Sequence, residues 1–193
     1  MNDGLISAAS EYIRGLFEGN SGGHDYEHSM RVFRLAMRIA EGEECDRELV
    51  ALAALLHDAD DHKLFNTKDN ANARAFMSGH GLPAGTMDRV CEAIDSVSFS
   101  RNGLGKPGTI EGMIVQDADR LDAIGAVGIA RTFAYGGEHG RPLGSSIDHF
   151  HEKLLKLKDG MNTATARKMA ESRHAFLEEF LARYEQETEG SGK

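Results

Sequence analysis

Helical spacing of the apolar residues is the feature that most limits how this chain can fold. Between residues 29 and 40, Met30, Phe33 and Met37 recur at intervals of three and four among arginines, which places them on one helix face. The segment 47–57, RELVALAALLH, is too apolar for a surface helix and is expected in the core. Alternating β-branched stretches bounded by turn residues are missing from the sequence. The pattern therefore predicts an all-α fold.

The same periodicity predicts where the helices lie. We expect them over residues 3–18, 29–40, 47–57, 68–79, 86–97, 109–134, 146–158 and 163–186. Asp46 and Thr109 are the expected N-caps of the third and sixth of these helices. Asn162 or Thr163 is expected to cap the last one.

Length and charge narrow the class of protein. The 193 residues suffice for about one domain, so we expect a single-domain helical bundle over 1–186 and a disordered polar tail over 187–193. The net charge is −9, from 22 basic and 31 acidic side chains, without the Lys/Arg cluster that a nucleic-acid binder needs. No run approaches the ~18 apolar residues of a membrane helix, and the N-terminus lacks the pattern of a signal peptide. Cys45 and Cys91 stand outside any CxxC motif and are expected as buried thiols. We therefore expect a cytoplasmic protein that binds neither nucleic acid nor a membrane.

Histidines and a carboxylate that can bind a metal lie on the inward faces of two predicted helices. His57-Asp58 closes the apolar helix, at the edge of the core. Taken alone, such a doublet is more often a polar cap on a core helix. Upstream, His28 lies on the apolar face of its own helix, where a hydrogen-bonded core histidine is the alternative interpretation.

Three aspartates lie close together in a third apolar helix, at Asp117, Asp119 and Asp122. Charged carboxylates are almost never buried unless they are paired or bound to a metal, so this group needs a cation. Arg120 is one candidate and a metal ion is the other. With the inward histidine and the doublet, one of these aspartates completes a set of two histidines and two aspartates. Mixed ligands of this kind suit Mn²⁺, Fe²⁺, Co²⁺, Ni²⁺ or Zn²⁺ better than Ca²⁺, and they leave about two positions of an octahedral ion open.

Three segments together resemble a known family. HSMRV, LLHDADD and QDADRLDAIG, in this order and on predicted helices, resemble the HD-domain metal-dependent phosphohydrolases. The resemblance covers about residues 20–180, and RLDAIGAVGIARTFAYGG and SSIDHFHEKLLKLKDGMNT are similar to a bacterial stand-alone HD hydrolase subfamily. It implies a helical bundle of the HD-domain type, with metal ligands at His28, His57, Asp58 and Asp119. Asp61, three positions after the HD aspartate, is implied to act near the attacking water.

The resemblance also bears on the metal and the substrate. Two-metal relatives carry extra histidines between the doublet and the last aspartate, where this sequence offers only His62 and His80. We therefore expect one divalent metal per site, with Mn²⁺ preferred and Fe, Co, Ni, Zn or Mg as alternatives. His24, Lys63 and Arg120 are the candidate substrate-binding residues.

Other charged residues near the motifs have two interpretations. Arg31, one turn from His28, is a further candidate for phosphate binding or an ordinary solvated charge. Asp25 and Asp122 are candidates to orient a histidine, and Asp122 pairing with Arg120 is the alternative.

The leading hypothesis from these observations is a metal-dependent phosphohydrolase that acts on a nucleotide, as a monomer or homodimer. The resemblance favours hydrolysis of a nucleoside triphosphate with release of pyrophosphate, through a water activated by the metal. A phosphatase acting on a nucleoside monophosphate is an alternative within the same chemistry. A non-catalytic, metal-containing module that binds or senses a nucleotide is an alternative from another class.

Overall fold

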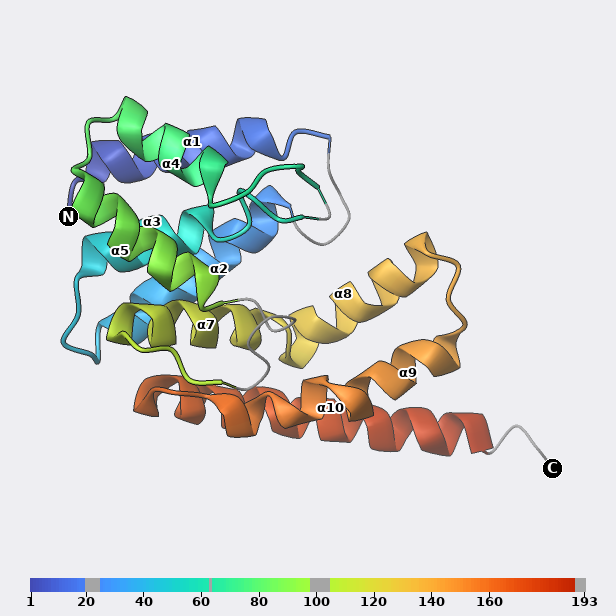
Figure 1. Ribbon diagram of the computed structural model, residues 1–193. Helices are drawn as coiled ribbons and strands as arrows, with labels where there is room; N and C mark the ends of the chain where they lie inside the picture. Colours follow the sequence, from blue (N-terminus) through green and yellow to red (C-terminus); the bar gives the residue numbers. More distant parts are fainter. Residues whose placement is uncertain (20–24, 63, 98–104, 190–193) are drawn as a thin grey trace.

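The structure is a computed structural model that describes residues 1–19, 25–62, 64–97 and 105–189, and its regular elements in these ranges are all helical (Figure 1). The α-helices are α1 (Asp3–Leu16), α2 (Tyr26–Ala40), α3 (Arg47–Leu56), α4 (Ala71–Gly79), α5 (Ala84–Asp95), α7 (Ile110–Asp122), α8 (Gly125–Glu138), α9 (Leu143–Glu152) and α10 (Ala164–Glu189). The all-α prediction is confirmed.

Helix α3 lies at the centre of the bundle, as its composition predicts. Every residue from Leu49 to Leu56 is buried, because the helix is apolar on all sides and other helices surround it. It contacts α1, α2, α5 and α7, and α2 also packs along α7. His28 on α2, His57 at the end of α3 and the aspartates of α7 are thereby brought to one region of the bundle.

Side-chain caps begin several helices at the positions expected from the sequence. Asp46 Oδ1 accepts a hydrogen bond from the Leu49 amide at 3.1 Å, and Thr109 Oγ1 accepts one from the Gly112 amide at 3.2 Å. Thr163 caps α10. Each cap satisfies an amide that lacks a partner within its own helix.

The predicted single helix over 109–134 is wrong, because the chain breaks after Asp122. Gly125 has a φ of +77°, a left-handed conformation that other residues rarely adopt, and α8 starts there in a new direction. A Cβ at Gly128 would lie 2.2 Å from the carbonyl oxygen of Ala123, so the two helices meet at a closeness that only glycine allows. The break lets α8 approach the end of α7 as a separate element.

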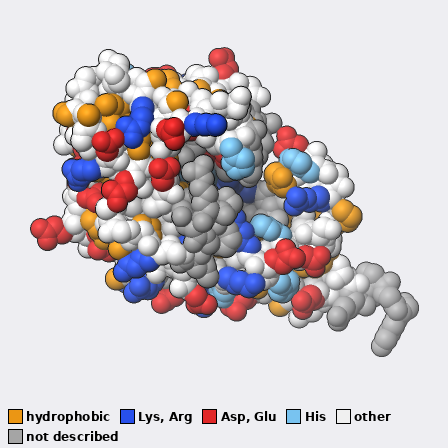
Figure 2. All heavy atoms as spheres, viewed as in Figure 1, with side chains coloured by type: hydrophobic (Ala, Val, Ile, Leu, Met, Phe, Trp, Pro, Cys, Tyr) orange, Lys and Arg blue, Asp and Glu red, His pale blue; other side chains and the backbone are white. Residues whose placement is uncertain are grey.

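Helices α8 and α9 form an arm that rests on α10 (Figure 1). Phe133 of α8, Phe150 of α9 and Phe180 of α10 hold it, with ring centroids 5.8–6.0 Å apart. Figure 2 shows the visible face hollowed between the main body and this arm, with basic and histidine side chains along the border.

Several predicted boundaries also change in the second half of the chain. The helix expected over 146–158 is α9 followed by two 3-10 turns, Leu154–Lys156 and Lys158–Gly160. Helix α10 continues through Glu189, so the first part of the expected tail is helical, and residues 190–193 lie outside the described part. Cys91 is buried as expected, whereas Cys45 is only half-buried. Within the described residues, none of the helices combines the length and apolar character needed to cross a bilayer.

Candidate metal centre

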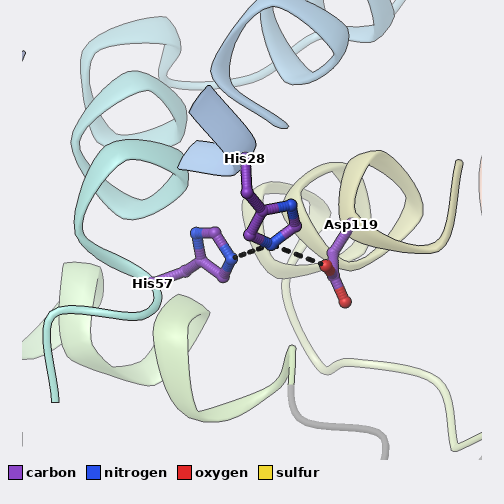
Figure 3. Close-up of side chains that lie close together, drawn as sticks. All are labelled: His28, His57 and Asp119. Atoms are coloured by element: carbon purple, nitrogen blue, oxygen red, sulfur yellow. Dashed lines mark hydrogen bonds and ion pairs between the residues drawn. The ribbon is translucent and has the colours of Figure 1, made fainter. Parts of the chain in front are cut away.

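His28, His57 and Asp119 bring their side chains together from α2, the end of α3 and α7 (Figure 3). One ligand atom from each lies within 4.8 Å of the other two. His28 Nε2 is 3.2 Å from His57 Nε2 and 3.5 Å from Asp119 Oδ1. Asp25 is the N-cap of α2, and its Oδ1 accepts a hydrogen bond from the His28 amide at 2.7 Å. His28 therefore lies in the first turn of the helix.

Asp58 adds a second carboxylate to this group. Its Oδ2 atom lies 3.4 Å from His28 Nε2 and 3.2 Å from His57 Nε2. Of the four metal ligands that the resemblance implies, His28 therefore lies within 3.5 Å of each of the other three.

Hydrogen bonds on the far side of each imidazole determine which nitrogen faces the cluster. His28 Nδ1 donates to Asp122 Oδ2 at 2.8 Å, and His57 Nδ1 donates to the Ala54 carbonyl at 2.9 Å. In the neutral rings, both Nε2 atoms are then lone-pair acceptors that face each other and two carboxylates. Acceptors this close together require a cation among them, so the donor set fits a divalent metal ion.

The pKa values of both histidines are raised, which means that the site favours positive charge. Burial lowers the pKa of His57, but the Asp58 carboxylate, with Asp119 and the Ala54 carbonyl, outweighs this and raises it to about 9. The pKa of His28 is also raised, because hydrogen bonds to Asp122 and Asp58 outweigh its burial. Both shifts therefore point to a site that favours positive charge.

Asp122 is the carboxylate that orients His28, as one of the sequence interpretations proposed, and its cationic partners are Arg31 and Arg131. It is 1% exposed, and its Oδ1 accepts from Arg31 Nε at 2.7 Å. Its Oδ2 accepts from Arg131 at 2.5 Å in addition to His28. These donors outweigh the effect of burial and lower the pKa of Asp122 well below its usual range.

Asp117 has no such role, although it lies on the same helix. Its Oδ1 accepts from the backbone and side-chain nitrogens of Asn162, and its Oδ2 accepts from the backbone nitrogen and hydroxyl of Thr163, all at 2.8–2.9 Å. These hydrogen bonds all come from neutral groups, and Arg120, one of the two cations expected for this group, interacts with Asp117 electrostatically. Neutral donors from the turn before α10 satisfy this buried carboxylate.

Asp61, the expected catalytic residue, follows the doublet in a turn. Helix α3 ends at Leu56, yet the Asp61 amide still donates to the Asp58 carbonyl at 3.1 Å, so one turn separates the two side chains. The Asp61 side chain is 11% exposed, and its Oδ1 lies 3.6 Å from His62 Nδ1.

Of the three residues predicted to bind substrate, the structure describes only Arg120. His24 and Lys63 lie outside the described residues. Arg120 is 3% exposed, donates to the Gly160 carbonyl and interacts electrostatically with Asp117 and Asp119, so its role in substrate binding stays a prediction. Arg131, which the sequence analysis did not single out, contacts Asp122 instead. Its position depends on the break between α7 and α8, and the sequence pattern did not predict that break.

Comparison with known proteins gives a consistent result. The family model of the HD domain matches residues 25–124, which is more than half of the chain. The chain belongs to the HD-domain phosphohydrolase family. This HD-domain protein is 43% identical to YpgQ of Bacillus subtilis over 187 residues, covering 93% of this chain and 91% of YpgQ. The crystal structure of YpgQ in complex with ADP matches with a TM-score of 0.81 and 37% identity over 95% of both chains. An HD-superfamily hydrolase from Bacillus thuringiensis matches with a TM-score of 0.81 and 36% identity, covering 98% of this chain and 99% of that one.

Proposed function

We propose that this HD-domain protein hydrolyses a nucleoside triphosphate between the α- and β-phosphates and releases pyrophosphate. The observation that carries the proposal is the convergence of two imidazole Nε2 atoms and two carboxylates at a site that is open on one side. The Asp119 side chain is 30% exposed, whereas His28 is 1% exposed, so a ligand can reach the cluster past Asp119. A closed structural metal site would leave no such opening.

The residues that would hold one divalent metal ion are His28, His57, Asp58 and Asp119, with Mn²⁺ as the preferred ion. When bound, such an ion polarises a phosphate oxygen and lowers the pKa of a water molecule. Asp122 and the Ala54 carbonyl keep the two imidazoles in the tautomer that directs Nε2 to the cluster.

Asp61 is the proposed general base. It follows Asp58 by one turn and is largely enclosed, so its carboxylate can accept a proton from a water held near the cluster. His24, Lys63 and Arg120 are the proposed partners for substrate phosphate oxygens, since their positions in the sequence flank the ligand motifs.

A nucleotide is the proposed substrate class because a relative that is similar over nearly its whole length, YpgQ, was crystallised with ADP. Release of pyrophosphate would distinguish this protein from a phosphatase that removes a single phosphate.

The test is to strip the protein of metal and offer it nucleoside mono-, di- and triphosphates with and without Mn²⁺, measuring phosphate and pyrophosphate separately. We expect pyrophosphate from the triphosphates only, and only with metal. Phosphate from a monophosphate would replace the proposal with the phosphatase activity. Absence of any product from protein that binds Mn²⁺ tightly would favour a non-catalytic module.

His80→Ala is a matched control for His57→Ala in this assay. Both histidines follow the last residue of a helix, and both donate from Nδ1 to a backbone carbonyl, His57 to Ala54 and His80 to Phe76. We expect His57→Ala to lose metal and activity, whereas His80→Ala keeps both.

A further inference from the structure

The turn that carries Asp58 is hydrogen-bonded to helix α4. Ala59 and Asp60 follow Asp58 directly, and each accepts a hydrogen bond from the first turn of α4. Asp60 Oδ1 accepts from the Asn72 amide at 2.9 Å, and the Ala59 carbonyl accepts from Asn72 Nδ2 at 2.7 Å. Asp60 Oδ2 accepts from the Ala73 amide at 3.1 Å. Three hydrogen bonds therefore join this turn to the start of α4.

Helix α4 depends on Asp60 because it lacks a side-chain cap of its own. Its N-cap residue, Asn70, has a φ of +55° and makes no capping hydrogen bond. Amides in the first turn of a helix have no partner within that helix. The Asp60 carboxylate is the partner of two of them, and its negative charge suits the positive end of the helix dipole. The cap of α4 therefore comes from the turn beside the metal centre.

Helix α4 is itself held by the body of the bundle and lies beside α1 (Figure 1). The Tyr12 hydroxyl of α1 donates a hydrogen bond to the Asn72 carbonyl at 3.2 Å, and the Tyr12 ring lies 5.0 Å from that of Phe76. Phe76 and Met77 are buried in the core. The turn after the doublet is therefore bonded to a helix that core packing keeps in place.

The same turn carries one of the proposed metal ligands. Asp58 Oδ2 lies 3.2 Å from His57 Nε2 and 3.4 Å from His28 Nε2. The Asp61 amide donates to the Asp58 carbonyl, so the backbone between these two residues forms one closed turn that contains Asp60. A displacement of Asp60 would therefore move Asp58 relative to the two histidines.

We propose that Asp60 and Asn72 are positioning residues of the metal centre, which hold the Asp58 carboxylate in place by joining its turn to α4. The inference rests on the proposed function and deepens it, because it adds α4 to the elements on which the site depends. In this role neither side chain contacts the metal or the substrate. Their hydrogen bonds fix the backbone of the turn, and that backbone sets the direction of the Asp58 side chain.

The test measures Co²⁺ binding to the intact chain, with the affinity and the visible spectrum of the ion as two readouts. Asp60→Ala removes two of the three hydrogen bonds, and Asn72→Ala removes the other one. Asp46→Ala is the matched control, since Asp46 also caps a helix and lies at the opposite end of α3 from His57. Far-UV circular dichroism checks that each variant keeps its helices.

We expect Asp60→Ala to weaken Co²⁺ binding by about 10-fold and to change the Co²⁺ spectrum at saturation. Asn72→Ala, which loses one hydrogen bond, should weaken Co²⁺ binding by about 3-fold. Asp60→Ala and Asp46→Ala should both lower the Tm by about 2–4 °C, because each removes a helix cap. Asp46→Ala should nevertheless bind Co²⁺ as the wild type does.

The comparison separates positioning from a general loss of stability. Wild-type affinity and spectrum in Asp60→Ala would overturn the inference. An equal loss of Co²⁺ affinity in Asp46→Ala would also overturn it, because loosening of any helix would then have the same effect.

A second measurement needs no variant, so it does not depend on the folding of Asp60→Ala. Coupling between two sites is reciprocal, so a bound metal must stabilise the hydrogen bonds to α4 if these bonds favour metal binding. Diamagnetic Zn²⁺ should slow hydrogen exchange of the Asn72 and Ala73 amides, followed by NMR, by about 3-fold or more. The Leu5 amide, which Asn2 caps at the start of α1, should exchange at the same rate with and without Zn²⁺. Unchanged exchange at Asn72 and Ala73 would contradict the proposal.

These measurements separate the inference from the proposed function. Co²⁺ binding that depends on Asp60 and Asn72, without hydrolysis of any nucleotide, would refute the hydrolase proposal and leave the positioning role standing. Metal-dependent hydrolysis of triphosphates, with the same Co²⁺ affinity in Asp60→Ala and the wild type, would do the reverse.

Discussion

Replacing Asp117 by asparagine tests whether this aspartate is purely structural. Its two oxygens each accept two hydrogen bonds, one oxygen from Asn162 and the other from Thr163. An asparagine offers only one acceptor oxygen, so its NH₂ group must face one pair of these donors. Asp117 is 0% exposed, and water cannot take the place of the lost acceptor.

The loss of stability follows from the number of buried donors that are left without an acceptor. A buried donor without an acceptor costs about 1–3 kcal/mol, so two of them lower the free energy of unfolding by about 2–6 kcal/mol. For a chain of this length, this corresponds to a fall in Tm of about 5–15 °C. Metal affinity should not change, because Asp117 is not among the residues of the proposed centre.

The assay is thermal and urea unfolding followed by far-UV circular dichroism, on metal-free protein, because a bound ion stabilises the folded state by mass action. Asp119→Asn is the control from the same helix. Its side chain is 30% exposed, and we expect it to keep the metal-free unfolding free energy within about 1 kcal/mol while losing metal affinity. An Asp117→Asn variant that unfolds like the wild type would refute the hydrogen-bond argument, and one that loses metal while keeping its Tm would make Asp117 a ligand.

The other predictions concern the metal centre. Asp58→Ala should abolish metal retention and turnover and leave the protein helical, as measured by metal analysis and circular dichroism; full metal-dependent turnover would show that the ligand assignment is wrong. Asp61→Asn should retain Mn²⁺ but lower kcat by about 10²- to 10⁴-fold, because it removes the proton acceptor; an unchanged rate would remove Asp61 from the mechanism. Asp122→Asn should weaken metal binding by about 10- to 100-fold, because His28 loses a charged partner. Equilibrium dialysis with Mn²⁺ measures this affinity, and an unchanged value would contradict the prediction.

Local sequence patterns were sufficient to predict most of the helices. The apolar segment 47–57 became the buried central helix, because a helix that is apolar on every side is stable only when surrounded. Asp46 and Thr109 became N-caps, because the bond they make is to an amide three residues ahead and needs no partner from elsewhere in the chain. The break at Gly125 was missed, since the apolar period continues across it and only the approach of two backbones requires glycine there.

The roles of the three aspartates of α7 show what the sequence by itself determined and what tertiary structure decided. Their presence in an apolar helix indicated that the group needs a cation, and this follows from the cost of burying a charge wherever the helix lies. Which partner each receives depends on the element packed against its face of the helix. Asp117 meets the turn before α10, Asp119 meets the histidines, and Asp122 meets arginines from α2 and α8. Residue type and spacing are local properties, whereas a hydrogen-bond partner distant in sequence is chosen only when the helices pack.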